Sequence, residues 1–499
     1  MPLTVEPPPL RALDAGVIED ARARQLRHRR AGAAALVAAA AIALALVALT
    51  APGKPKPAGT ATAIIFAPAG PTVDARAFSH EGDLAFVSRG ALWVLDGSGR
   101  LRRVASHAGY GAPAPAFSAD GRWLAYVTSS YASDTTRLWI ARADGSDRHQ
   151  ITWLHDPRMI GWSPRGDQLA VSARSDIPTG YRGVLVGRQT SVWLLTPGGS
   201  RRRLMRASQI DGGVWSPDGS QLAVASDSGY VYGRAPWVAS LVAYPIAGGR
   251  PTLWLRLDSA ATFAGGDQNL FLPAGWWPGW GIGFWIVGAA SDDPSVLDGG
   301  GIDLWHLPTP GAAPRLLGKT LANGTLSPIV ASTTGRLAIT NEPPGSQGAR
   351  PLWQGQQVER CSPATQRCLD VVQPPGTVSL DPAWSPDGSA LAYLVGRASN
   401  SARNIQDQNV VARWYDALEL WLYKPATGTS VHVPAARGAV TPIWSKTGDS
   451  LLFVADDGLW LWKHLKGAPV EIAGPLLSPS NWNSYFAQID WNGQFAWSR

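Results

Sequence analysis

A ten-residue pattern that recurs along the chain constrains the fold more than any other feature of this sequence. Its two clearest copies are Trp215–Val224 and Trp384–Tyr393, which share Trp-Ser-Pro-Asp-Gly followed two residues later by Leu-Ala. Looser copies begin at Phe78, Phe117, Trp162 and Trp444. Leu-Trp or similar strand-like pairs lie downstream, at Leu92-Trp93, Leu138-Trp139, Val192-Trp193, Leu304-Trp305, Leu420-Trp421 and Leu459-Trp460. Short alternating strands that repeat every roughly 40 to 60 residues indicate the blades of a β-propeller.

The pattern itself is turn chemistry with an aromatic residue in front of it. Pro favours the φ of a turn, Asp bonds the turn backbone, and Gly accepts the positive φ that starts the return strand. The preceding Trp is expected to pack between neighbouring blades, so Trp215, Trp384 and Trp444 are predicted to be core residues and not ligand contacts.

These motifs and the downstream Leu-Trp strands resemble the WD-like repeat of TolB-type propellers, over about residues 75 to 475. The resemblance implies an all-β fold and says little about function, because one fold serves many functions. We count eight units and predict eight blades, with seven as the alternative. The units begin near Ala77, Ala116, Ile160, Val214, Leu270, Ile329, Ala383 and Ile443.

The N-terminal segments predict attachment to a membrane. Residues 1–30 are polar and Arg-rich, 31–50 form an uncharged run, and 51–60 are a Pro-rich linker. Twenty apolar residues suffice to cross a bilayer as a helix. The Arg cluster before the run predicts a single-pass signal anchor with a cytoplasmic N-terminus and residues 61–499 as an extracytoplasmic propeller.

Net charge and motifs limit the choice of partners. The formal charge is +7, of which residues 1–30 carry +2 and Lys54 and Lys56 a further +2, so little remains for the propeller. Such a dilute charge is not typical of nucleic-acid binding, and no nucleic-acid partner is predicted. No cofactor or metal is predicted either. The expected partners are the membrane, through residues 31–50, and a protein or cell-envelope ligand.

Catalysis is not predicted, although a propeller enzyme remains the alternative. No Gly-x-Ser-x-Gly pentapeptide occurs, and no region free of propeller motifs is long enough for a hydrolase domain. A lyase or lactonase would gather polar groups on the first strands of the blades, around a central channel. Those strands are expected to offer mainly apolar and Ser residues.

The two cysteines, Cys361 and Cys368, flank six residues between strand-like segments. Outside the cytoplasm, a disulfide across this hairpin is the expected state.

Extra length in the units indicates where a ligand would bind. Insertions between second and third strands span 173–190, 226–240, 289–301, 341–356 and 396–416, and such connections share one face of a propeller. We call this the looped face. The insertions carry residue types that are enriched at interface hot spots. The predicted binding residues are Tyr181, Arg182, Tyr230, Tyr232, Arg234, Trp237, Trp353, Arg413, Trp414 and Tyr415. The alternative is that these aromatic residues pack within their own loops.

Overall fold

The chain divides into two compact units, residues 1–69 and 70–499. The computed structural model describes residues of the second unit: 70–106, 115–130, 135–174, 189–228, 238–258, 269–288, 301–321, 329–341, 353–399, 408–476, 482–483, 488–489, 491 and 493–498.

The predicted localisation is contradicted by the helices of the structure. In the described part of the chain, no helix is long and apolar enough to cross a membrane. The longest described helix, α4 (Gln408–Tyr415), has 8 residues. At 1.5 Å per residue it spans about 12 Å, against about 30 Å for a bilayer core. Three predicted segments lie outside the described residues: the tail 1–30, the membrane helix 31–50 and the linker 51–60.

The described unit is all-β, as predicted, and its strands form antiparallel sheets in which consecutive strands are neighbours. The first of them along the chain contains β2 (Leu84–Ser88), β3 (Ala91–Leu95) and β4 (Leu101–Ala105). The second contains β5 (Ala116–Phe117), β6 (Trp123–Ser130), β7 (Thr135–Arg142) and β8 (His149–Gln150). The third contains β9 (His155–Trp162), β10 (Leu169–Arg174), β11 (Thr190–Leu195) and β12 (Arg201–Ala207). The fourth contains β13 (Gln209–Trp215), β14 (Gln221–Asp227), β15 (Val238–Pro245) and β16 (Thr252–Asp258).

The next sheet has eight strands, and the remaining large sheets again follow chain order. The eight-stranded sheet begins with β17 (Asn269–Trp277), β18 (Gly281–Gly288), β19 (Gly301–Leu307) and β20 (Arg315–Leu321). Its other half contains β21 (Ile329–Ala331), β22 (Leu337–Asn341), β23 (Gln357–Ser362) and β24 (Arg367–Asp370). Another sheet contains β25 (Thr377–Trp384), β26 (Leu391–Arg397), β27 (Glu419–Lys424) and β28 (Thr429–Arg437). The last contains β29 (Val440–Trp444), β30 (Leu451–Ala455), β31 (Gly458–Trp462) and β32 (Val470–Gly474).

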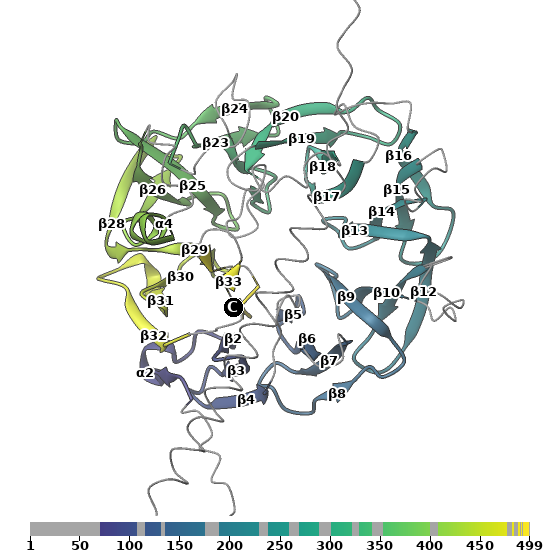
Figure 1. Cartoon of the computed structure of the whole chain (residues 1–499), viewed down its shortest axis with the longest axis horizontal. Helices are drawn as coiled ribbons and strands as arrows, with labels where there is room; N and C mark the ends of the chain where they lie inside the picture. Colours follow the sequence, from purple (N-terminus) through teal and green to yellow (C-terminus); the bar gives the residue numbers. More distant parts are fainter. Residues whose placement is uncertain are drawn as a thin grey trace, which may run out of the picture. The chain divides into compact units, whose positions relative to one another are not determined.

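Within this unit the sheets follow one another around a ring, with the first strand of a sheet innermost and the fourth at the rim (Figure 1). Segments near the two ends of the unit complete the first and last sheets. The C-terminal strand β35 (Phe495–Trp497) pairs with β2, and β1 (Thr72–Val73) pairs with β32. Helix α2 (Ala75–Phe78), the 3-10 turn η2 (Lys463–Leu465) and the strand pair β33 (Trp482–Asn483) and β34 (Gln488–Ile489) are small additions.

The predicted chemistry of the recurrent turn is confirmed. The Ser216 hydroxyl donates to Asp218 Oδ1 at 2.6 Å and accepts from the main-chain N–H of Gln221 at 2.9 Å. Gly219, with φ of 67°, occupies the conformation that only glycine adopts at little cost. The hydroxyl of Ser216, together with the N–H and hydroxyl of Ser220, lowers the pKa of Asp218 to about 2. The motif aspartate is therefore fully used in holding its turn.

The motif tryptophans join neighbouring sheets. Trp384 and Trp444 are buried, which confirms them as core residues, and Trp215 is half-buried. In three copies the indole N–H donates to a main-chain carbonyl on the first strand of the preceding sheet, at 2.8–3.0 Å: Trp162 to Ala116, Trp215 to Gly161 and Trp444 to Ala383. The same residue thus supplies apolar burial and a directional bond between sheets.

Candidate functional site

The structure describes four of the ten residues that were predicted to bind a ligand. Trp353 is only 5 % exposed, and its ring lies 5.7 Å from that of Trp414, which in turn lies 5.5 Å from Tyr415. Trp414 donates through Nε1 to Arg397 O at 3.0 Å, while Arg413 on the same helix α4 is exposed. These three aromatic side chains pack against one another and so join the insertions 341–356 and 396–416. The other six, Tyr181, Arg182, Tyr230, Tyr232, Arg234 and Trp237, lie outside the described residues.

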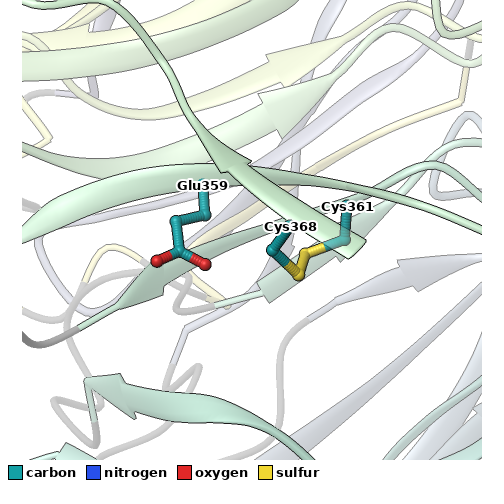
Figure 2. Close-up of side chains that lie close together, drawn as sticks. All are labelled: Glu359, Cys361 and Cys368. Carbon is teal, nitrogen blue, oxygen red and sulfur yellow. A yellow bond between two sulfur atoms is a disulfide. The ribbon is translucent and has the colours of Figure 1, made fainter. Parts of the chain in front are cut away.

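The cysteines form the disulfide that the hairpin suggested. Cys361 on β23 pairs directly with Cys368 on β24, and Glu359 lies on the same side of the hairpin (Figure 2). The three side chains are close enough to surround a metal ion. With both sulfurs in the disulfide, however, they offer one carboxylate and no thiolate. That carboxylate already accepts a bond from Asn341 Nδ2 at 2.6 Å.

Removing the disulfide tests its contribution to stability. Because the bridge closes a short loop, with a sequence separation of 7, we expect C361S/C368S to lower the free energy of unfolding by about 2 kcal/mol. Chemical denaturation measures the loss, and the wild type unfolded with a thiol reductant is the matched control. Equal midpoints for oxidised, reduced and double-mutant protein would show that the bridge does not stabilise the fold.

The inner strands carry acidic residues that the sequence had not revealed. Strand β9 begins at His155, where Ile160 had been expected, β13 at Gln209 in place of Val214, and β25 at Thr377 in place of Ala383. The additional residues include Asp156, Asp211 and Asp381. The inner strands are mainly apolar, as expected, but three of them also carry the polar groups that an inner-strand site requires.

Two of these aspartates have structural partners. Asp381 Oδ2 accepts from the main-chain N–H of Thr441 at 2.7 Å and so connects β25 to β29. Asp156 Oδ2 lies 3.1 Å from Arg174 Nη1, and its Oδ1 accepts from the Thr136 hydroxyl at 3.0 Å. Carboxylates with such partners stabilise the join between strands and sheets and need no ligand.

Asp211 is different because half of its carboxyl group lacks a partner. Its Oδ1 accepts from Gln209 Nε2 at 3.0 Å, whereas its Oδ2 is buried and has no hydrogen-bond partner among the residues that the structure describes. Burial, followed by the nearby charge of Asp227, raises the pKa of Asp211 to about 7, although the bond from Gln209 acts to lower it. We call Gln209, Asp211 and Asp227 the Asp211 site.

The fold explains why these carboxyl groups are held together. Strand β13 pairs with β14, with Gln209 opposite Asp227, and the register shifts between Ile210 and Gly212. Asp211 is the extra residue of this bulge, a feature that re-aims side chains and is common beside functional sites. Asp227 is 7 % exposed and ends β14, where the insertion before β15 begins. The Asp211 site therefore lies at the looped face.

A carboxyl group with a pKa near 7 has two chemical uses. When ionised it attracts a cation. Because Asp227 lies nearby, the pair attracts a cation more strongly than a lone surface carboxylate does. When it exchanges a proton near neutral pH it is suited to general acid–base chemistry. Carboxyl groups whose pKa is strongly shifted by burial and by a specific neighbour are more frequent at functional sites than elsewhere.

The unit 70–499 is thus an all-β protein of the β-propeller class with a partly buried acidic pair at one end of an inner strand. No family model matches the sequence, and no curated protein matches it. Among solved structures the chain resembles an oligogalacturonate lyase in complex with manganese, with 14% identity, 82% of this chain and 97% of that chain covered, and a TM-score of 0.41. The β-propeller domain of the trilobed protease from Pyrococcus furiosus is 10% identical, with 72% of this chain and 96% of that chain covered and a TM-score of 0.40. A prolyl endopeptidase is 13% identical, with 78% of this chain and 54% of that chain covered and a TM-score of 0.44. These likenesses carry no function over to this chain.

Proposed function

We propose that the protein is a TolB-like, eight-bladed β-propeller that binds a cationic ligand at the Asp211 site, on the looped face. The count of eight is supported by six sheets of four or five strands and by the eight-stranded sheet. The two halves of that sheet meet through β20 and β22 at one residue pair, Thr320 with Asn341, which favours two adjacent blades over one. The TolB-like assignment is supported by the recurrent Trp-Ser-Pro-Asp-Gly turns.

The observation that carries the binding proposal is the buried, unpartnered Oδ2 of Asp211. A buried acceptor without a donor costs about 1–3 kcal/mol, and more when it is charged. A ligand that brings an ammonium or guanidinium group would supply the missing donor and the opposite charge. The insertion that follows Asp227 carries the aromatic residues Tyr230, Tyr232 and Trp237, a residue type whose ring face attracts organic cations. The natural ligand is then a protein or cell-envelope molecule that presents a basic group.

A screen with simple cations tests the proposal. Putrescine, glucosamine, lysine and arginine amides and Ca²⁺ are the probes, and the melting temperature of the wild type is compared with that of D211N. A probe at 100 times its Kd stabilises the fold by about 2.7 kcal/mol. We expect at least one probe to stabilise the wild type and not D211N. D218N, which alters a turn aspartate of the same sheet, is the matched control and should respond like the wild type.

The same screen repeated at two pH values checks the mechanism. Because the pKa of Asp211 is about 7, only the ionised form attracts a cation, and this form is a small fraction at pH 5.5. Apparent affinity should fall about 30-fold between pH 8 and 5.5, since it scales with the competent fraction. Equal responses of wild type and D211N to every probe at pH 8 would reject the binding site.

The shifted pKa of Asp211 also favours a second candidate, an enzyme of the lyase or lactonase type with this residue as general base. In that case turnover of polyuronates or lactones should show a pH–rate limb near 7 that D211N abolishes. If the protein binds cations but turns over neither polyuronates nor lactones, the enzyme candidate is rejected and the binding function remains.

A further inference from the structure

The positive charge of this protein is concentrated in one segment of the sequence. Residues 155–207, which contain β9 to β12, hold nine arginines, three aspartates and no lysine or glutamate, a net charge of +6 in a chain whose total is +7. The flanking segments 70–154 and 208–268 carry +1 and −2. A small total charge thus conceals a strongly basic sheet between two nearly neutral or acidic neighbours.

The rim strand of this sheet presents the arginines to solvent. Arg201, Arg202, Arg203 and Arg206 on β12 are all exposed, and β12 is the outermost strand of its sheet (Figure 1). Residues 189–207 contain no acid. Within the described ranges, no carboxylate lies at salt-bridge distance from any of these four side chains, so their charges are not neutralised there.

A bulge places three of these arginines in one row. Arg201, Arg203 and Arg206 lie opposite Leu195, Trp193 and Ser191, which are alternate residues of β11. The register shift between Val192 and Trp193 makes this possible, because without it Arg206 would face the other side of the sheet. Alternate residues of a strand are spaced by about 6.6–7 Å. The row therefore repeats with the spacing of side chains on one face of a neighbouring strand.

Two of the guanidinium groups are held by tryptophan rings. The Cζ of Arg201 lies 4.6 Å from the ring centre of Trp153, and that of Arg203 lies 5.8 Å from Trp193. The two rings contact each other edge to face, with centres 4.9 Å apart. Stacking on an aromatic face restrains a guanidinium while the N–H groups at its edge stay available to anionic oxygens. This arrangement reduces the entropy that the arginine side chains lose when an anionic partner binds.

From this arrangement we propose that β12 is the docking edge for an extended acidic segment of a protein partner. The segment adds a strand beside β12 and places alternate carboxylates against Arg201, Arg203 and Arg206. In the described part of the chain β12 pairs with β11 alone, so its second edge carries no strand. A single row of arginines along a strand edge fits a peptide strand, whereas a nucleic acid is typically met by a broad basic face. This surface is separate from the Asp211 site and does not depend on it.

Fluorescence polarisation with the full chain tests the docking edge. The probes are labelled peptides of alternating Glu and Thr, alternating Gln and Thr, and the Glu-Thr peptide methylated at every main-chain nitrogen. The first should bind with an affinity that falls as salt rises, and the second should bind at least tenfold more weakly because it lacks charge. The third carries the same charge but has no main-chain N–H groups to donate to β12, so it should also bind much more weakly. Equal binding of the Glu-Thr peptide and its methylated form would overturn strand addition.

Variants identify the residues responsible. R201Q/R203Q/R206Q should weaken Glu-Thr binding by at least about 100-fold, since each charge-assisted contact is worth about a factor of ten or more. R103Q is the matched control. Arg103 on the rim strand β4 lies opposite Trp93, just as Arg203 on β12 lies opposite Trp193. R103Q and D211N should both bind as the wild type does, and circular dichroism should show an unchanged fold in each variant. Unchanged binding by the triple variant, or tighter binding of polyphosphate or a single-stranded oligonucleotide than of the Glu-Thr peptide, would overturn the assignment.

Discussion

Trp444→Ala is expected to lower the free energy of unfolding by about 3–5 kcal/mol, the usual cost of emptying a large aromatic site in a core. Trp444 is 8 % exposed, and it packs in the largest apolar cluster, which joins the last sheets to the first. Its Nε1–H also donates to Ala383 O at 2.8 Å, so the substitution removes a bond between two sheets. Chemical denaturation measures the loss. A cost below about 1 kcal/mol would contradict the role of the motif tryptophan as an inter-sheet residue.

Two conservative variants separate the hydrogen bond from the packing. Trp384 occupies the same motif position and is 4 % exposed, but its Nε1 has no partner in the part of the chain that the structure describes. Phenylalanine removes the N–H and retains much of the apolar volume. We therefore expect W444F to cost about 1–3 kcal/mol more than W384F, because it leaves the Ala383 carbonyl without its donor. Equal losses would show that the N–H···O bond adds nothing to packing.

Asp211→Asn should make the protein more stable at pH 8, although it removes the proposed binding group. The pKa of Asp211 is about 7 in the folded protein, against an ordinary value of 3.8. Between these values the folded form binds a proton that the unfolded form has released, so stability falls as the pH rises from about 4 to 7. The upper limit of the effect is about 4 kcal/mol, at about 1.4 kcal/mol per pKa unit. Because Asp211 is partly exposed, we expect about 2 kcal/mol.

Urea denaturation of wild type and D211N at pH 4 and pH 8 measures this effect. The difference between the two proteins should be near zero at pH 4, where Asp211 is protonated in the folded form, and should favour D211N at pH 8. D218N should show the opposite sign, because the pKa of Asp218 is lowered to about 2 and its ionised form stabilises the turn above pH 4. A carboxyl group that weakens the fold and yet lies at the proposed ligand site fits the common exchange of stability for function.

The parts of this fold that were predicted correctly depend on local chemistry. The Ser216–Asp218 turn, the buried Trp384 and Trp444, and the paired Cys361 and Cys368 are each determined by residues adjacent in the chain or across one hairpin. Such features recur with a fixed spacing, so a single sequence reveals them. The membrane anchor was a different kind of inference, from apolar length alone, and the helices of the described residues contradict the localisation drawn from it.

The Asp211 site could not be predicted because a bulge breaks the pattern on which strand prediction depends. Alternation of apolar and polar residues indicates a strand, and the extra residue Asp211 interrupts that alternation in β13. Asp381-Pro382 does the same in β25, where the register shifts between Leu380 and Ala383. Both strands were therefore predicted to begin at the regular segment before the Trp, and the residues that precede this segment, which include Asp211 and Asp381, were missed. The burial that raises the pKa of Asp211 is a tertiary property with no local signal.

A titration of the Asp211 carboxyl group itself tests the proposed binding site most directly. Protein labelled with ¹³C at the aspartate carboxyl carbon is followed by NMR from pH 4 to pH 9, and the spectra of D211N assign the resonance that belongs to Asp211. We expect a titration midpoint near 7 for this resonance. A midpoint below about 5, close to the ordinary value for an aspartate, would mean that Asp211 is solvated or paired, and would contradict the binding site.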